Sequence, residues 1–183
     1  MNPYRSIFES ILQDPRYQAS LDWGEPRSGH PEGTVRAHIA ELDTNLERLR
    51  GRLSDEEYWK LKVLIHVHDS FKADAKTGTA ITDPRSHASL ARAFLAEFCD
   101  DADVLAMVQY HDEPYALWRK SRHGEANEPR FAALLKNITD WNLFTAFLLI
   151  DGGTAGKDRA PLQWLFENID GKVNTSFSAN DLL

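Results

Sequence analysis

The residues best suited to chemistry are histidines, and helical phase separates those that can share an interior from those that cannot. Seven are present: His30, His38, His66, His68, His87, His111 and His123. One predicted helix buries the face formed by Leu61, Leu64 and Ile65. A step of about 100° per residue puts His68 within that arc and His66 roughly 140° away from Leu61. His68 is therefore predicted to point inward, and His66 is interpreted as a partly exposed or packing histidine.

Carboxylates and further histidines can meet His68. Asp69 flanks the same helix face, so the adjacent pair offers one imidazole and one carboxylate, which divalent metals accept together. His38 lies at the edge of an apolar stripe on the preceding helix. His111 continues the apolar row of the helix that precedes it. We expect these four side chains to converge on a divalent metal site.

The final acidic ligand has two candidates on one long apolar segment. Asp151 is in register with apolar residues at the end of that segment, where an unpaired carboxylate would be costly to bury and a cation would remove the cost. Asp140 lies 11 residues earlier and falls on almost the same azimuth. The Gly152-Gly153 pair favours Asp151, because it leaves the end of the helix open to substrate and solvent. His123 is interpreted as a loop residue.

Apolar spacing predicts an all-α fold in a single domain, residues 1–183. Residues recur at three and four positions over 35–49, about 55–70, 90–98, 104–111 and 131–150, the longest of these segments. Ser54 with Glu57 forms a capping-box signature, and Ser86 is a plausible N-cap that puts His87 in a first turn. Glycine and proline between these segments predict loops, and strand patterns are nearly absent.

Composition excludes several classes of protein. The 183 residues carry a formal net charge of −7, which argues against a broad surface for duplex nucleic acid. No apolar run is long enough to cross a membrane, and no signal pattern opens the sequence. Cys99 is the single cysteine, as expected in a reducing cytoplasm. The sequence leaves the oligomeric state open, a homodimer included.

This ordered set resembles the HD superfamily of metal-dependent phosphohydrolases. The stretch His30-Pro31-Glu32-Gly33, followed by His38, looks like the HPEG…H segment of HD domains attached to bacterial tRNA nucleotidyltransferases. His68-Asp69 corresponds to the His-Asp pair; Lys72 keeps the lysine of the common HD-x-G-K pattern, and Phe71 replaces its glycine. His87, His111 and Asp151 match the subgroup with the order H…HD…H…H…D, and Gly156-Lys157 is similar to a small-basic pair that often follows. The match spans about residues 30–157.

The resemblance implies an HD-domain-like helical bundle with a central site for two divalent ions, drawn from Mn, Mg, Ni, Co, Zn or Fe. His38, His68, Asp69 and Asp151 would hold one ion, and His87 with His111 would complete a second site that shares Asp69. Such a pair activates water for hydrolysis of a phosphate ester or anhydride, here of a small nucleotide-like substrate.

Further residues are assigned to catalysis and substrate by the same resemblance. Asp69 and Lys72 are the expected catalytic residues, with Lys72 stabilising a phosphate oxygen or orienting Asp69. The expected substrate contacts are His30, Glu32, Arg36 and Lys157, although His30 and Glu32 could instead support the metal ligands. Further candidate phosphate contacts are Lys76, Arg85, Arg119 and Lys120.

Two other classes use the same scaffold. HD-type proteins resembling myo-inositol oxygenase hold two irons with the same ligand order and cleave substrate with oxygen. A non-catalytic binding or regulatory module is the third hypothesis, and we expect such a module to have lost ligands. All six ligand positions here carry residues that can bind metal, which disfavours it.

Overall fold

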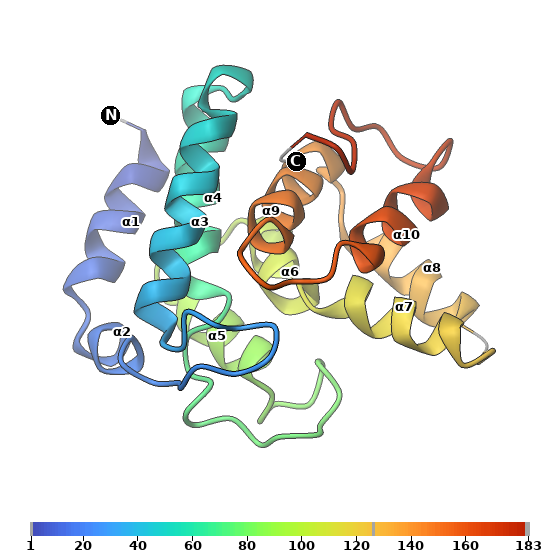
Figure 1. Ribbon diagram of the computed structural model, residues 1–183. Coiled ribbons are helices and arrows are strands. Elements are labelled where there is room, and N and C mark those ends of the chain that lie inside the picture. The colour runs from blue at the N-terminus through green and yellow to red at the C-terminus, as the bar shows by residue number, and fades with distance from the viewer. Residues whose placement is uncertain (1, 126, 182–183) are drawn as a thin grey trace.

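The computed structural model describes residues 2–125 and 127–181, and within them the chain is helical, without a sheet (Figure 1). The elements are α1 (Pro3–Gln13), α2 (Pro15–Ser20), α3 (Val35–Leu49), η1 (Arg50–Arg52), α4 (Asp55–Val67), α5 (His87–Leu95), α6 (Ala102–Tyr110), α7 (Glu113–Arg122), α8 (Glu128–Asn137), α9 (Trp141–Gly152) and α10 (Ala160–Ile169). An isolated bridge joins Arg27 and His30. The predicted all-α class is confirmed.

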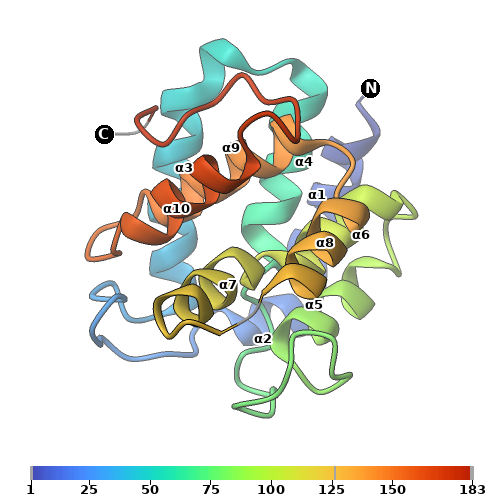
Figure 2. The same ribbon diagram turned by 90° about the vertical axis from the view of Figure 1, so that its right-hand side faces the viewer.

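Two apolar helices form the centre of the core. α9 is buried at every residue from Leu143 to Ile150, and α4 is buried from Val63 to Val67. The two helices pack against each other, and α4 also contacts α1, α3, α5 and α6. α7, α8 and α10 lie on the other side of α9 from α1 and α4 (Figures 1 and 2). Side chains at the ends of these central helices are therefore held by packing on several sides.

The predicted helix starts agree with local capping chemistry. The Ser54 hydroxyl accepts the Glu57 amide while the Glu57 carboxylate accepts the Ser54 amide, so the capping box is formed. Ser86 caps α5 through the Ser89 amide, which makes His87 its first residue. The helices predicted from the spacing at residues 35–49, 55–70, 90–98 and 104–111 are confirmed as α3, α4, α5 and α6, with shifts of a few residues at some ends.

The predicted continuous helix over residues 131–150 is wrong, because the chain breaks between α8 and α9. Ile138 adopts an extended conformation with φ −99° and ψ 123°. The Asp103 carboxylate accepts the Thr139 and Asp140 amides at 2.8 and 2.7 Å, and the Asp140 side chain caps α9 through Leu143. These contacts satisfy amides that a continuous helix would have satisfied internally.

Four helices were not expected from apolar spacing: α1, α2, α7 and α10. Each has a proline in its first turn, where the missing amide costs nothing and the fixed φ favours a helix start. From the sequence, proline is interpreted only as a sign of loops, so these helix starts are not predicted. No described helix has the length and apolar character needed to span a bilayer.

Candidate metal centre

Six side chains from different helices meet at one place beside the central pair α4 and α9. His38 comes from the first turn of α3, and His68 and Asp69 directly follow α4. The remaining positions lie at helix ends: His87 opens α5, His111 caps the end of α6, and Asp151 lies in the last turn of α9. Helix packing therefore fixes the backbone from which each side chain projects.

His38, His68 and Asp151 form the first cluster, whose ligand atoms lie within 4.8 Å of one another. Asp151 Oδ1 is 3.0 Å from His38 Nε2 and 3.8 Å from His68 Nε2. Asp140, the rival for the final acidic position, lies at the opposite end of α9 and is occupied as a helix cap. The structure thus places Asp151, and not Asp140, with the histidines.

Asp69, His87 and His111 form the second cluster, with the same 4.8 Å limit between ligand atoms. Asp69 Oδ1 is 3.5 Å from His111 Nε2 and 3.9 Å from His87 Nε2. The two imidazole Nε2 atoms are 3.1 Å apart. Each cluster has one more exposed member, since the side chains of His87 here and of Asp151 in the first cluster are both 21% exposed.

The Asp69 carboxylate faces both clusters. Its Oδ2 atom lies 3.6 Å from His68 Nε2 and 3.8 Å from His38 Nε2, while Oδ1 faces the second cluster. Asp69 is buried, with a side chain 9% exposed. One carboxylate between two sets of imidazoles is the arrangement needed for a ligand shared by two ions.

Hydrogen bonds to the backbone fix which nitrogen of two histidines points inward. His68 Nδ1 donates to the Ile65 carbonyl at 3.0 Å, and His111 Nδ1 donates to the Val108 carbonyl at 2.8 Å. In the neutral imidazole, Nε2 then carries a lone pair aimed at the carboxylates.

His68 Nε2 is buried and has no hydrogen-bond partner among the described residues. Burial lowers the pKa of His68 although Asp69 and Asp151 oppose this, so the neutral form that binds metal is favoured. Neutral imidazole nitrogens with carboxylate oxygens are a donor set that fits a divalent ion of the zinc, manganese, nickel or iron type.

His38 is oriented by an acidic residue behind it. Glu32 Oε1 lies 3.1 Å from His38 Nδ1 and accepts a hydrogen bond from His30 Nδ1 at 2.9 Å. His38 Nε2 points to the other side and lies 3.0 Å from Asp151 Oδ1, where a bound cation would replace this contact. Of the two roles expected for Glu32, substrate contact and support of a ligand, its position beside His38 fits the second.

Two lysines neutralise the clustered acids. Lys72 Nζ is 2.5 Å from Asp69 Oδ2, and Lys157 Nζ is 2.6 Å from Asp151 Oδ1. Burial opposes ionisation of both carboxyl groups, but Lys72 and Lys157 with the nearby imidazoles hold the pKa values of Asp69 and Asp151 well below their usual range. Both acids are therefore ionised and able to bind a cation at neutral pH.

Phe71 explains how the chain departs from the glycine of the HD-x-G-K pattern. It has φ 65°, in the left-handed region, and is the only non-glycine residue with positive φ in the described chain. A side chain there costs roughly 1–2 kcal/mol. The ring packs 5.0 Å from that of Phe94, a contact that stabilises the turn. The turn brings Lys72 back onto Asp69.

Asp112 is the one residue of the centre that had been assigned no role. Its Oδ2 atom is 3.2 Å from His87 Nε2 and 3.7 Å from His111 Nε2. Burial opposes its ionisation, but His111 and His87 together hold its pKa well below the usual value. Asp112 follows His111, so the two form a second His-Asp pair that, like His68-Asp69, comes at the end of a helix and has an inward histidine. This repetition is the sequence signal that could have identified Asp112.

The expected substrate contacts divide into two groups. His30 and Lys157 line a cavity of about 530 Å³ beside the metal centre, together with Lys72, His111 and Asp151. Arg36, also expected to contact substrate, does not line the cavity: its guanidinium pairs with Asp22 at 2.9 Å on the surface. Arg36 is two positions, about 200°, from His38 on one helix and so faces the other way.

The other basic candidates also lie outside the residues that line the cavity. Arg85 pairs with Asp83, Lys120 pairs with Glu125, and Arg119 lies over the Tyr115 ring; Lys76 is exposed. His66 is buried and packs against Phe8 of α1, so of its two interpretations the packing histidine is confirmed and the partly exposed one is not. His123 follows α7 as its C-cap residue and is exposed, in agreement with its interpretation as a loop residue.

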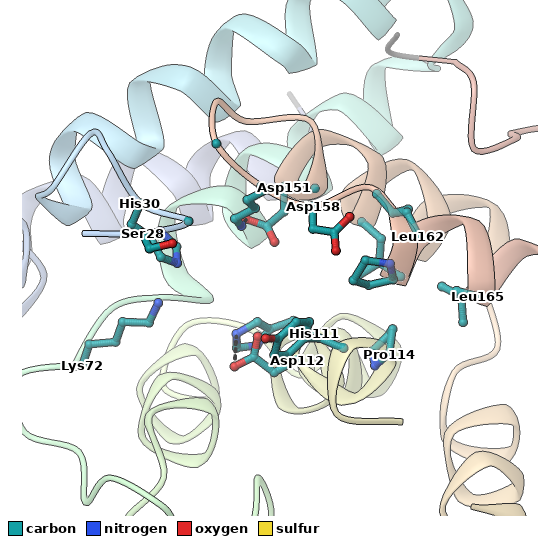
Figure 3. Close-up of a pocket in the computed structure, with 17 residues that line it drawn as sticks. Ser28, His30, Lys72, His111, Asp112, Pro114, Asp151, Asp158, Leu162 and Leu165 are labelled. Atoms are coloured by element: carbon teal, nitrogen blue, oxygen red, sulfur yellow. Dashed lines mark hydrogen bonds and ion pairs between the residues drawn. The ribbon is translucent and has the colours of Figure 1, made fainter. Parts of the chain in front are cut away.

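The cavity gives the centre access to solvent. Figure 3 shows His30 and Lys72 at one end, Asp151 and Asp158 on one wall, and His111 with Asp112 on the wall opposite. The chain matches no protein-family model, and it matches neither a curated protein nor a solved structure. Its geometry and its residue order therefore carry the functional argument.

Proposed function

We propose that this protein is a metal-dependent phosphohydrolase of the HD type, which cleaves a phosphate ester or anhydride of a small nucleotide-like substrate. The observation that carries the proposal is the position of Asp69, whose two oxygens face two separate groups of imidazole nitrogens. The residue order H…HD…H…H…D and the helical bundle around it support the same assignment.

The ligand sets follow from the two clusters. His38, His68 and Asp151 with Asp69 Oδ2 would hold one ion, and His87 and His111 with Asp69 Oδ1 would hold the other. Two such ions supply Lewis acidity and a water of lowered pKa for in-line attack on phosphorus. Glu32 keeps the His38 ring oriented.

The lysines complete the phosphate environment. Lys72 and Lys157 both line the cavity and place their ammonium groups beside the ligand carboxylates. An ammonium at this position can bind a non-bridging phosphate oxygen and offset the charge that develops on it. The cavity admits substrate and water from one side, whereas the His68 side chain, 1% exposed, is closed to solvent.

Metal content and turnover test this proposal on one sample. The purified protein is stripped with a chelator, reloaded separately with Mn²⁺, Ni²⁺, Co²⁺ or Mg²⁺, and assayed for phosphate release from a generic phosphomonoester and phosphodiester, with elemental analysis. We expect metal-dependent hydrolysis that Asp69→Ala abolishes. Arg36→Ala is the matched surface control and should keep full activity.

Oxygen uptake separates the phosphohydrolase from the rival iron oxygenase. The iron-loaded protein is placed in an oxygen electrode with the same substrates and with a cyclic polyol. Hydrolysis without oxygen uptake supports the proposal. Oxygen consumption that depends on Asp69, or phosphate release that persists in the metal-stripped Asp69→Ala variant, would overturn it.

A further inference from the structure

The cavity beside the metal centre is polar at one end and apolar at the other. Lys72 and His30 lie at the end near the clusters, whereas Pro114, Leu162 and Leu165 lie at the far end (Figure 3). A bound substrate with its phosphorus at the metal centre would direct the rest of its structure toward these apolar side chains. The two ends therefore constrain different parts of the substrate.

The charged side chains at the polar end can accommodate one phosphate group but not several. Among the described residues lining the cavity, Lys72 and Lys157 are the only lysines or arginines, and each is paired with a ligand carboxylate. Three acids, Asp112, Asp151 and Asp158, line the same cavity. A second or third phosphate would meet carboxylates instead of the several cationic groups that polyphosphate recognition requires.

The apolar side chains that line the cavity come from α7, α9 and α10, and they are Pro114, Tyr115, Leu148, Pro161, Leu162 and Leu165. Of these, Pro114, Leu162 and Leu165 lie at the far end (Figure 3). The Tyr115 hydroxyl is the single polar side-chain group in this set, so hydrogen-bonding edges of a substrate would find few partners here.

A glycine allows this apolar wall to close. A Cβ at Gly152 would lie 2.2 Å from Leu162 Cδ1, so Leu162 can pack against the end of α9 only because residue 152 has no side chain. The same helix end carries Asp151. The apolar wall is thereby brought directly beside a ligand of the first cluster.

We infer that the substrate is a phosphomonoester with a single phosphate on an apolar alkyl or aromatic alcohol. This inference rests on the metal-dependent phosphohydrolase activity of the proposed function, and it replaces the nucleotide-like substrate named there with a phosphate ester of an apolar alcohol. In the reaction, a water oxygen forms a bond to phosphorus and the bond from phosphorus to the alcohol oxygen breaks. The alcohol leaves with a proton, and inorganic phosphate is released. The apolar alcohol portion occupies the end of the cavity formed by α7 and α10.

Alkyl phosphates of increasing length test the apolar end, because their leaving alcohols have similar acidity. Methyl, butyl and hexyl phosphate are compared as substrates of the metal-loaded protein. We expect kcat/KM to rise about threefold for each of the first few added methylenes. The ratio of hexyl to methyl phosphate should fall at least fivefold in Leu162→Asn and less in Tyr115→Ser. Each ratio is internal to one protein sample, so partial misfolding does not alter it.

Phosphate number is tested with a nucleoside triphosphate against the matching monophosphate. We expect a higher kcat/KM for the monophosphate, and Asp158→Asn should narrow the difference by a few-fold. Equal kcat/KM for methyl and hexyl phosphate, or preference for the triphosphate, would overturn this inference while leaving the proposed function intact. Absence of phosphate release from every substrate with every metal would instead contradict the proposed function itself.

Discussion

His66 and His68 lie two residues apart at the end of α4, and both are buried, yet their surroundings differ. His66 Nδ1 shares a 2.5 Å hydrogen bond with the Tyr17 hydroxyl, and Phe8 packs edge-on against its ring at 4.7 Å. Its Nε2 faces one carboxylate, Asp43, at 3.6 Å. His68 Nε2 instead faces two carboxylates and has further imidazoles within reach.

Burial therefore does not distinguish a metal ligand from a structural histidine in this protein. The distinguishing features are the number of ligand atoms that converge on the nitrogen and the presence of a cavity leading to them. His66 contacts Phe8 of α1 and Tyr17 of α2, and these contacts stabilise the packing of both helices against α4. His68 lies where the ends of five helices, α3, α4, α5, α6 and α9, meet, and the cavity reaches this point through Asp151 and His111.

The largest expected effect on metal content and turnover is the difference between the same substitution, histidine to glutamine, at the two positions. His68→Gln removes a ligand nitrogen, and we expect metal content and hydrolysis to fall by about 100-fold or more, beyond the range of supporting residues. His66→Gln should retain metal and turnover per folded molecule. Elemental analysis and phosphate release on folded, monodisperse samples of both variants measure this. Equal metal loss in both would remove the distinction between the two histidines.

A smaller effect is expected where a residue acts through a ligand. Glu32→Gln keeps the size of the side chain but removes the negative charge that orients His38. We expect the affinity for Mn²⁺ or Ni²⁺ to fall about 10- to 100-fold with an unchanged melting temperature of the metal-free protein. Titration against a chelating indicator measures the affinity, and Arg36→Ala serves as the control on the adjacent helix. Unaltered affinity in Glu32→Gln would show that His38 needs no such support.

The smallest effect belongs to the structural histidine. Tyr17→Phe removes the hydroxyl that pairs with His66 Nδ1 in the core. We expect the free energy of unfolding to fall by about 1–3 kcal/mol, because a buried polar atom loses its partner. Denaturant unfolding of the metal-free protein measures this, and metal content should stay at the level of the unaltered chain. Loss of metal in Tyr17→Phe would place His66 in the metal centre after all.

Helical phase anticipated the parts of the centre that depend on local geometry. His38, His68 and His111 each lie on an apolar helix face, and that face had to turn toward the core. The same reasoning argues against Arg36 as a substrate contact, because Arg36 lies about 200° from His38 around the same helix. The burial of His66 depends on α1, whose apolar residues Tyr4, Ile7, Phe8, Ile11 and Leu12 recur at three and four positions but were not interpreted as a helix.

Other features depend on contacts between distant residues, which periodicity does not encode. The break before α9 relies on Asp103, 36 residues before Thr139. Asp112 lies beyond the last turn of α6, where the phase of that helix no longer predicts a direction. The left-handed turn at Phe71 occurs in a residue type that gives no signal for it.

The contact between Asp103 and the start of α9 has a mechanical consequence for the centre. Asp103 lies in the first turn of α6, and His111 lies at the other end of that helix, about 12 Å away along the axis. Asp151 lies at the far end of α9. α6 and α9 are therefore joined through Asp103, Thr139 and Asp140, at the ends of the two helices that are remote from the centre. A substitution at this joint can change the distance between His111 and Asp151, and with it the spacing of the metal ligands, without replacing any ligand.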